Sequence, residues 1–188
     1  MKTILRSLLW GAVLLALYLA GIFNFVSSLA QGAVIQSGLV DAAPDSKGDA
    51  PFDFNFVIKD LAGKKMDFNT YKGKVVFLNL WATWCAPCRS EMPAIQKLYE
   101  EVDQSKVSFV MLSLDKDTQR EKVKTFVNDK SFTFPVFMSS GYLTEQLQVP
   151  SIPTTLVIDK RGNIVFKEVG MRNYHTPKFK KFLDELTD

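Results

Sequence analysis

The sequence predicts an α/β domain whose central sheet is covered by helices on both faces. Residues 74–80 and 107–114 are nearly continuous apolar runs, the pattern of parallel strands that are buried on both sides. The residues between these runs repeat apolar side chains at helical spacing, and strand and helix signals keep alternating towards the C-terminus. The resulting order, β, βαβ, α, ββα, is typical of a small sheet packed against helices.

The elements around the first central strand are predicted from the spacing of apolar side chains. Residues 52–58 alternate, which places their phenylalanines on one face, and the turn signal at 62–64 then indicates a hairpin at the sheet edge. After the strand over 74–80, a helix is expected from its apolar positions Met92, Ile95, Leu98, Tyr99 and Val102.

The remaining elements follow in the second half of the domain. Thr118 and Glu121 have the spacing of a capping box, which predicts the start of a second helix near them. The later signals are, in order, a strand over 132–138, a short helical segment near 143–147, two strands over 154–159 and 164–170 joined by a hairpin turn, and a last helix that begins near 176–177.

The N-terminal region contains an apolar segment long enough to cross a membrane. Lys2 and Arg6 are its only charges, and residues 8–26 would span about 28 Å as a helix, close to the bilayer's hydrocarbon thickness of about 30 Å. We therefore expect a cytoplasmic stub over residues 1–6 and a transmembrane anchor, or uncleaved signal, over residues 7–27. The alternative is a signal peptide that is cleaved at the small residues Ser28-Leu29-Ala30.

Both interpretations place the rest of the chain outside the cytoplasm, because the positive charges hold the N-terminus inside. Residues 28–51 include a small, polar stretch punctuated by Pro and Gly, and are expected to form a flexible tether. Residues 52–188 have the length of one domain with its own core. The net charge of +3 is spread along the chain, so no binding to nucleic acid is expected.

The two cysteines of the chain, Cys85 and Cys88, are separated by only two residues. A purely structural disulfide that closes so short a loop would remove little entropy from the unfolded chain. A four-ligand zinc site is disfavoured because the chain has a single histidine, His175, which is expected at the surface. A copper(I) carrier that uses both thiolates and Met92 is an alternative of a different functional class.

A redox-active dithiol has a physical reason at each position of the motif, and it requires no metal or cofactor. If a helix begins near Cys85, the Cys85 sulfur faces unpaired N–H groups and the positive end of the helix dipole, which favour the attacking thiolate. Cys88 lies one turn further along and can attack a mixed disulfide at Cys85. Pro87 falls in the first turn, where its missing N–H costs nothing, whereas Pro93 is expected to kink the helix.

The stretches FLNLWATWCAPCRSEMP and VPSIPTTLVID resemble the thioredoxin superfamily, and specifically the membrane-anchored TlpA/ResA/DsbE group of thiol-disulfide oxidoreductases. The resemblance covers residues 52–188. It implies a thioredoxin fold, with a central mixed sheet between helices and an added N-terminal β-hairpin, preceded by one transmembrane helix. It also implies a single-pass protein of the bacterial cytoplasmic membrane, with its N-terminus inside and its catalytic domain in the periplasm or at the cell exterior.

The resemblance further implies which residues form the site. Pro153 is expected to be a catalytic cis proline beside the cysteine motif, and Ile152 is expected to offer its backbone to an extended substrate segment. Trp84, Ala86 and Pro87 are the other expected substrate contacts.

Glu91 is the remaining catalytic candidate. The resemblance implies that Glu91 exchanges a proton with the buried Cys88, and a partly buried carboxylate would also raise thiol pKa values by like-charge repulsion. The alternative is a solvated acid near the helix N-terminus. Asn79 replaces the buried aspartate of ordinary thioredoxins, so Glu91 is the acid left at this place.

The expected function is that of an extracytoplasmic thiol-disulfide oxidoreductase, more specifically a reductase of disulfides in exported proteins. The resemblance implies that a membrane thiol electron donor of the DsbD/CcdA type recharges it. The alternative is a DsbA-like disulfide oxidase, although strongly oxidising members carry a histidine where this motif has Ala86-Pro87. A binding module with incidental thiols is a further alternative. The element typical of DsbE proteins dedicated to cytochrome c biogenesis is replaced by VPSIPTT, which argues against a dedicated role with apocytochrome c.

Overall fold

The computed structural model describes residues 50–188, residues 40–43 and isolated positions between residues 10 and 38. The expected cytoplasmic stub, residues 1–6, and most of the expected anchor, residues 7–27, lie outside the described residues. Within the described part of the chain, no helix is both long enough and apolar enough to cross a membrane.

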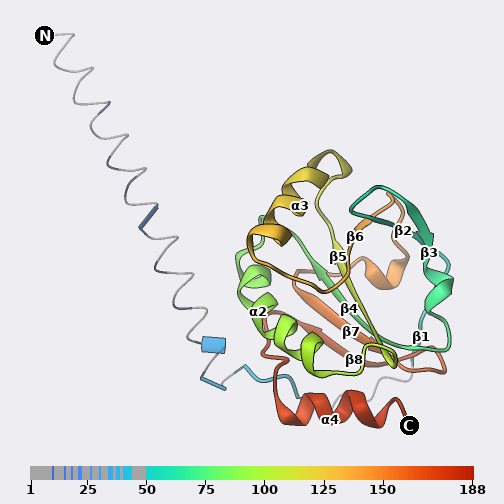
Figure 1. Ribbon diagram of the computed structural model, residues 1–188. Coiled ribbons are helices and arrows are strands. Elements are labelled where there is room, and N and C mark those ends of the chain that lie inside the picture. The colour runs from blue at the N-terminus through green and yellow to red at the C-terminus, as the bar shows by residue number, and fades with distance from the viewer. Residues whose placement is uncertain are drawn as a thin grey trace, which may run out of the picture.

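A single mixed sheet forms the centre of the described domain (Figure 1). Its strands are β1 (Ala50–Pro51), β2 (Val57–Asp60), β3 (Lys65–Asp67), β4 (Val75–Trp81), β5 (Val107–Ser113), β6 (Val136–Ser139), β7 (Thr154–Ile158) and β8 (Asn163–Val169). Their order across the sheet is β1-β8-β7-β4-β5-β6-β2-β3. β5 pairs in parallel with β4 and β6, whereas the other neighbours are antiparallel. The two apolar runs are β4 and β5, which confirms their prediction as central parallel strands.

The α-helices of the described domain all pack on one face of the sheet. They are α2 (Ala86–Glu101), α3 (Arg120–Asp129) and α4 (Pro177–Glu185). Their buried side chains share one hydrophobic cluster with alternate residues of β4. The intervening β4 residues belong to a second cluster on the opposite face, which is covered by residues 52–56 and two short 3-10 helices, η1 (Phe68–Tyr71) and η3 (Glu145–Leu147).

Helices therefore cover both faces of the sheet, as predicted, but on the second face they are the 3-10 helices η1 and η3 and not α-helices. The segment near 143–147, expected to be helical, forms the single 3-10 turn η3 rather than an α-helix. Gly141 and Pro150 bound this segment and leave too few residues for a longer helix.

β2 and β3 pair antiparallel at one edge of the sheet. Before them, Phe52, Phe54 and Phe56 are all buried, as their alternation predicted, and they pack around Phe68. The strand predicted over 52–58 starts later than expected, because the Phe56 N–H bonds to the Phe54 carbonyl within the segment instead of to a neighbouring strand.

Both predicted helices begin near the expected residues, α3 at Arg120 and α4 at Pro177, but their N-caps differ. Thr176 caps α4 by accepting a hydrogen bond from the Phe179 N–H at 3.1 Å, so this helix begins where the sequence predicted. The capping box of Thr118 and Glu121 does not form. Thr118 lies inside a 3-10 turn, η2 (Asp117–Gln119), and the residue at the N-cap of α3 is Gln119, whose side chain makes no capping bond.

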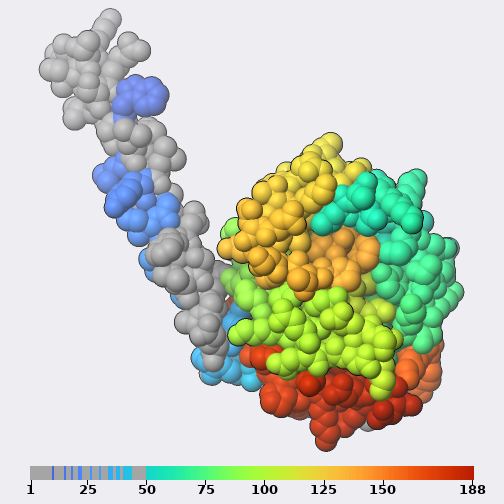
Figure 2. Space-filling view, in the orientation of Figure 1, coloured from blue at the N-terminus to red at the C-terminus, as the bar shows by residue number. Residues whose placement is uncertain are grey.

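Part of the segment expected to be a flexible tether lies against the domain. Asp41 forms a parallel bridge with Asn173, and Ala42 is buried. Figure 2 shows this blue segment in contact with the domain, beside the green of α2 and the red of the C-terminal region.

Candidate active site

Cys85 and Cys88 form a disulfide at the point where the chain passes from β4 into α2, with Cys85 just before the helix and Cys88 in its first turn. The Cys85 N–H donates to the Ala82 carbonyl at 3.1 Å, which turns the chain out of the sheet. Cys88 is fully buried, whereas Cys85 retains 5% exposure. Cys85 is therefore the sulfur of the pair that a partner molecule reaches first.

Cys85 is the N-cap residue of α2, as the spacing of the motif predicted. Its Sγ accepts a hydrogen bond from the Cys88 N–H at 3.2 Å, and Ala86 and Pro87 occupy the first helical positions. An N–H group that points at Sγ, together with the helix dipole, favours a thiolate at Cys85 once the disulfide is reduced. Pro93 lies inside α2, which continues through it, so the kink at Pro93 stays a prediction.

Pro153 approaches the disulfide from the start of β7. The Ile152–Pro153 peptide bond is cis, which confirms the geometry that the family resemblance implied. The carbonyl oxygen of Ile152 lies 3.6 Å from Cys85 Sγ. The cysteine pair and the Ile152–Pro153 segment, far apart in the sequence, therefore form one site.

An apolar pocket of about 340 Å³ adjoins this site. Trp84, which is 62% exposed, and Ile152 line it next to the cysteines. Its other walls come from the residue that follows β5 and from the η3 region, and include Leu114, Leu143, Leu147 and Val149. Two of the four expected substrate contacts thus line this pocket, whereas Ala86 and Pro87 are half-buried at the start of α2.

Glu91 is fully buried, one helical turn beyond Cys88 on α2. Its Oε1 accepts a hydrogen bond from Asn79 Nδ2 at 2.8 Å, and its Oε2 accepts one from the Arg172 N–H at 3.1 Å. Burial raises the pKa of Glu91 from 4.5 to about 8, although both hydrogen bonds and the charge of Arg172 act in the opposite direction. The alternative of a solvated surface acid is therefore wrong.

Asn79 connects Glu91 to the neighbouring strand. Besides Glu91, its Nδ2 donates to Thr155 Oγ1 on β7 at 2.9 Å. Tyr174 is buried in the same region, and desolvation by burial followed by the charge of Glu91 raises its pKa well above 10. A buried carboxyl that takes up a proton near neutral pH is suited to proton exchange with a buried thiol.

Asp115 is a buried residue beside the site that the sequence patterns did not predict. Its Oδ2 accepts hydrogen bonds from the Thr83 N–H and from Ser113 Oγ, both at 2.8 Å, and its Oδ1 accepts one from Thr83 Oγ1 at 2.6 Å. These bonds fasten the turn that leads to Cys85. The available signal was an acidic residue at the carboxyl end of a buried parallel strand, the edge where functional groups of such sheets gather.

We expect the substitution Asp115→Ala to lower the free energy of unfolding by about 2–3 kcal/mol, because it leaves buried donors without an acceptor. Urea unfolding of the oxidised protein measures this effect. The matched control is Asp103→Ala, which removes a carboxylate that accepts the same kinds of bonds from the N–H and hydroxyl of Ser105 on an exposed loop. Equal losses in the two variants would contradict the role given to Asp115.

Met92 belongs to the same hydrophobic cluster as Cys85 and Cys88, whereas His175 is not part of that cluster. Met92 is buried in the core below α2, and His175 pairs through Nε2 with Glu101 Oε1 at 2.8 Å. In the described ranges there is no group of three or more His, Cys, Asp or Glu side chains arranged to hold a metal ion.

Comparisons with known proteins agree with this geometry. The chain is 41% identical over 117 residues to the thiol-disulfide oxidoreductase ResA of Bacillus cereus, a match that covers 62% of this chain and 66% of that protein. It is 36% identical over 134 residues to the ResA of Bacillus thuringiensis subsp. konkukian, with 71% and 75% covered. The chain thus spans about two thirds of the length of the first of these relatives, and three quarters of the second.

The chain is also similar to a solved structure and to a protein family. A crystal structure of a thiol:disulfide interchange protein, a thioredoxin family protein from Chlorobium tepidum TLS, has a TM-score of 0.58 at 28% identity, covering 79% of this chain and 99% of that chain. Residues 42–167, well over half of the chain and including the disulfide, Glu91 and the cis proline, match the AhpC/TSA family. The chain therefore belongs to the AhpC/TSA family and has a thioredoxin-like fold.

Proposed function

We propose that this protein is a thiol-disulfide oxidoreductase that reduces disulfides in other proteins. The observation that supports this proposal most directly is the position of Cys85, which is the more exposed residue of the pair, caps α2 and lies beside the Ile152 carbonyl. The similarity to ResA proteins, which are named thiol-disulfide oxidoreductases, supports the same reaction class.

The reaction begins with the reduced form of the pair. The Cys85 thiolate attacks one sulfur of a substrate disulfide, the substrate S–S bond breaks, and the departing substrate sulfur leaves as a thiolate that takes up a proton. Cys88 then attacks Cys85 Sγ in the mixed disulfide. The Cys85–Cys88 disulfide forms, the second substrate thiolate departs, and two electrons have moved from this protein to the substrate.

Glu91 serves the second step. Cys88 is fully buried and must lose its proton before it attacks. A carboxyl with a pKa of about 8 takes a proton from such a thiol at a smaller cost in free energy than an ordinary carboxylate does, because its pKa is closer to that of the thiol.

The apolar pocket beside Cys85 is proposed to bind the substrate segment that flanks its cysteine. We expect Trp84→Ala to lower kcat/KM for a protein disulfide about 5- to 30-fold, because a large exposed ring at the mouth of the pocket is lost, corresponding to about 1–2 kcal/mol. The control is Tyr142→Ala, which removes an equally exposed ring that lines a different pocket. Similar losses in both variants, measured by steady-state kinetics, would count against the pocket.

The surroundings of the reaction are part of the proposal. Residues 1–6 are proposed to stay in the cytoplasm, residues 7–27 to anchor the chain in the bacterial cytoplasmic membrane, and the domain over 52–188 to face the periplasm or the cell exterior. A membrane thiol donor of the DsbD/CcdA type would return the two electrons. In intact cells, a membrane-impermeant maleimide should label Cys85 after reduction; labelling only after lysis would place the domain inside.

The activity itself is tested with the full chain in detergent micelles. Catalytic amounts of the protein should accelerate the reduction of insulin disulfides by dithiothreitol. A rate equal to that of dithiothreitol alone would contradict the proposed function.

A further inference from the structure

The chain segment before the domain lies against the loop that carries one of the hydrogen-bond donors to Glu91. We call residues 40–42 the strap. The Asn173 N–H donates to the Val40 carbonyl at 2.8 Å, and the Ala42 N–H donates to the Asn173 carbonyl at 3.0 Å. Both backbone groups of Asn173 are therefore paired with the strap.

Side chains strengthen this contact. Asn173 Nδ2 donates to Asp41 Oδ1 at 2.9 Å. Ala42 is only 2% exposed and belongs to the same hydrophobic cluster as both cysteines. An isolated surface contact would not bury a side chain in the core, so the strap is part of the folded domain.

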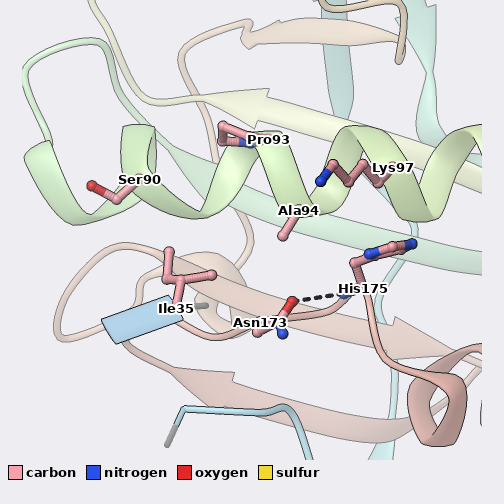
Figure 3. A pocket seen from close by; sticks show the side chains of 7 residues that line it. All are labelled: Ile35, Ser90, Pro93, Ala94, Lys97, Asn173 and His175. Carbon is pink, nitrogen blue, oxygen red and sulfur yellow. Dashed lines mark hydrogen bonds between the residues drawn. The ribbon is translucent and has the colours of Figure 1, made fainter. Parts of the chain in front are cut away.

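A second contact lies just before the strap. Ile35 is 6% exposed and points towards α2 across a pocket of about 220 Å³, which it lines together with Pro93, Ala94 and Asn173 (Figure 3). Ile35 and the strap thus lie next to α2, the helix that carries Glu91, and to the loop of Asn173. Both of these elements contribute to the surroundings of the carboxyl.

The link from the strap to Glu91 is one residue long. Arg172, the neighbour of Asn173, donates its backbone N–H to Glu91 Oε2. Its guanidinium is held in turn by Glu168 at 2.6 Å and by the Met171 carbonyl at 3.0 Å. The bond from the Asn173 N–H fixes the planar peptide unit that this group shares with the Arg172 carbonyl, so only the φ and ψ angles of Arg172 separate the strap-bound unit from the Arg172 N–H.

We propose that the strap is a positioning element of the active site: residues 40–42 hold Asn173 so that the Arg172 N–H stays on Glu91 and solvent stays away from it. The inference rests on the proposed role of Glu91 in proton transfer. It assigns Asp41, Ala42 and Asn173 to the support of the site, in a segment that precedes the strands and helices of the thioredoxin-like domain.

The groups that surround Glu91 define what displacing the strap would change. Cys88 lies one turn away on α2, and Asn79 of β4 donates to Glu91 and to Thr155 of β7. The loop bound by the strap contributes Tyr174 and Arg172, and Arg172 forms an ion pair with Glu168 of β8. Displacement removes one hydrogen bond and admits water. Burial is the largest cause of the raised pKa of Glu91, so the admission of water is expected to dominate and to lower that pKa.

The test compares two identical substitutions at adjacent positions of the full chain in detergent micelles. Ala42→Glu places a charge at the buried position, whereas Ala43→Glu places the same charge at the exposed neighbour. NMR follows the titration of the Glu91 carboxyl carbon and the hydrogen exchange of the Arg172 amide. We expect Ala42→Glu to move the Glu91 midpoint down by about one pH unit and to speed the exchange at least about tenfold. Ala43→Glu should match the wild type.

The inference is overturned if both variants match the wild type. If Ala42→Glu unfolds the domain, Asp41→Ala is used instead, because it removes only the side-chain bond to Asn173. A smaller downward shift of the Glu91 midpoint in Asp41→Ala supports the role of the strap. The absence of any shift contradicts it. Failure of the proposed role of Glu91 can be told apart from failure of the strap inference. If Glu91 has no role in proton transfer, Glu91→Gln leaves the rate of thiol exchange unchanged, but the titration of Glu91 in the strap variants still shows whether the strap positions the site.

Discussion

Replacement of Cys85 by serine should lower the rate of disulfide exchange by at least about 1,000-fold, because it removes the nucleophile. Cys88→Ser should also stop turnover, but with a different product. The first attack still occurs, and the mixed disulfide between Cys85 and the substrate accumulates because no second sulfur resolves it. Incubation with a protein disulfide, followed by non-reducing gel electrophoresis and mass spectrometry, identifies the cysteine in the adduct.

The contrast between these two variants tests the assignment of roles. Both keep one thiol, so differences in thiol content do not explain their behaviour. The buried position of Cys88 predicts that Cys85→Ser forms little or no adduct. If the adduct instead forms on Cys88 in the Cys85→Ser variant, the roles of the two cysteines are reversed.

The stability of the oxidised protein should depend on pH through Glu91. The pKa of its carboxyl is about 8 in the folded protein and about 4.5 once unfolding removes burial, so between these values the folded protein binds the extra proton. The stabilisation by this proton is complete below pH 4.5 and is lost as the pH rises to about 8. The loss is about 1.4 kcal/mol per pH unit, or about 4–5 kcal/mol in total.

Glu91→Gln removes this titration, so its free energy of unfolding should fall much less between pH 5 and pH 9. Urea unfolding at several pH values measures the slope. Glu121→Gln, a change at a well-exposed side chain, serves as the control and should retain the wild-type slope. Parallel slopes for wild type and Glu91→Gln would mean that Glu91 is not protonated in the folded protein at neutral pH.

The same substitution should affect the chemistry of the thiols. Above about pH 8 the Glu91 carboxylate is charged and raises the pKa values of the nearby thiols, whereas an amide does not. Glu91→Gln should therefore speed the reaction of Cys85 with iodoacetamide above about pH 8 and leave it close to the wild type at lower pH. An unchanged pH profile would remove Glu91 from the mechanism.

The parts of the fold that the sequence predicted correctly are those with a local signal. The continuous apolar runs marked β4 and β5, and Cys85 at the N-cap of α2 followed from the spacing of the motif and the position of Pro87. The burial of Phe52, Phe54 and Phe56 followed from their alternation. In each case, short-range spacing decides which side chains face the core.

The features that the sequence did not predict depend on contacts between distant segments. The donor to Glu91 Oε2 is a backbone N–H, which any residue at position 172 except proline would supply, so Arg172 carried no signal. Thr83 and Asp115 meet only because β4 and β5 end side by side. The docking of Ala42 was hidden by the small, polar composition that suggested a tether, since alanine is as easily buried as exposed.

The reduction potential of the Cys85–Cys88 pair tests the central claim most directly. The full chain is equilibrated with glutathione or dithiothreitol buffers, and the fraction of the disulfide is measured at each ratio. A reductase of exported proteins should have a potential of about −200 to −270 mV, the range of glutaredoxins and thioredoxin. A value near about −120 mV would instead indicate an oxidase, and one below about −300 mV a structural disulfide; either would contradict the proposed function.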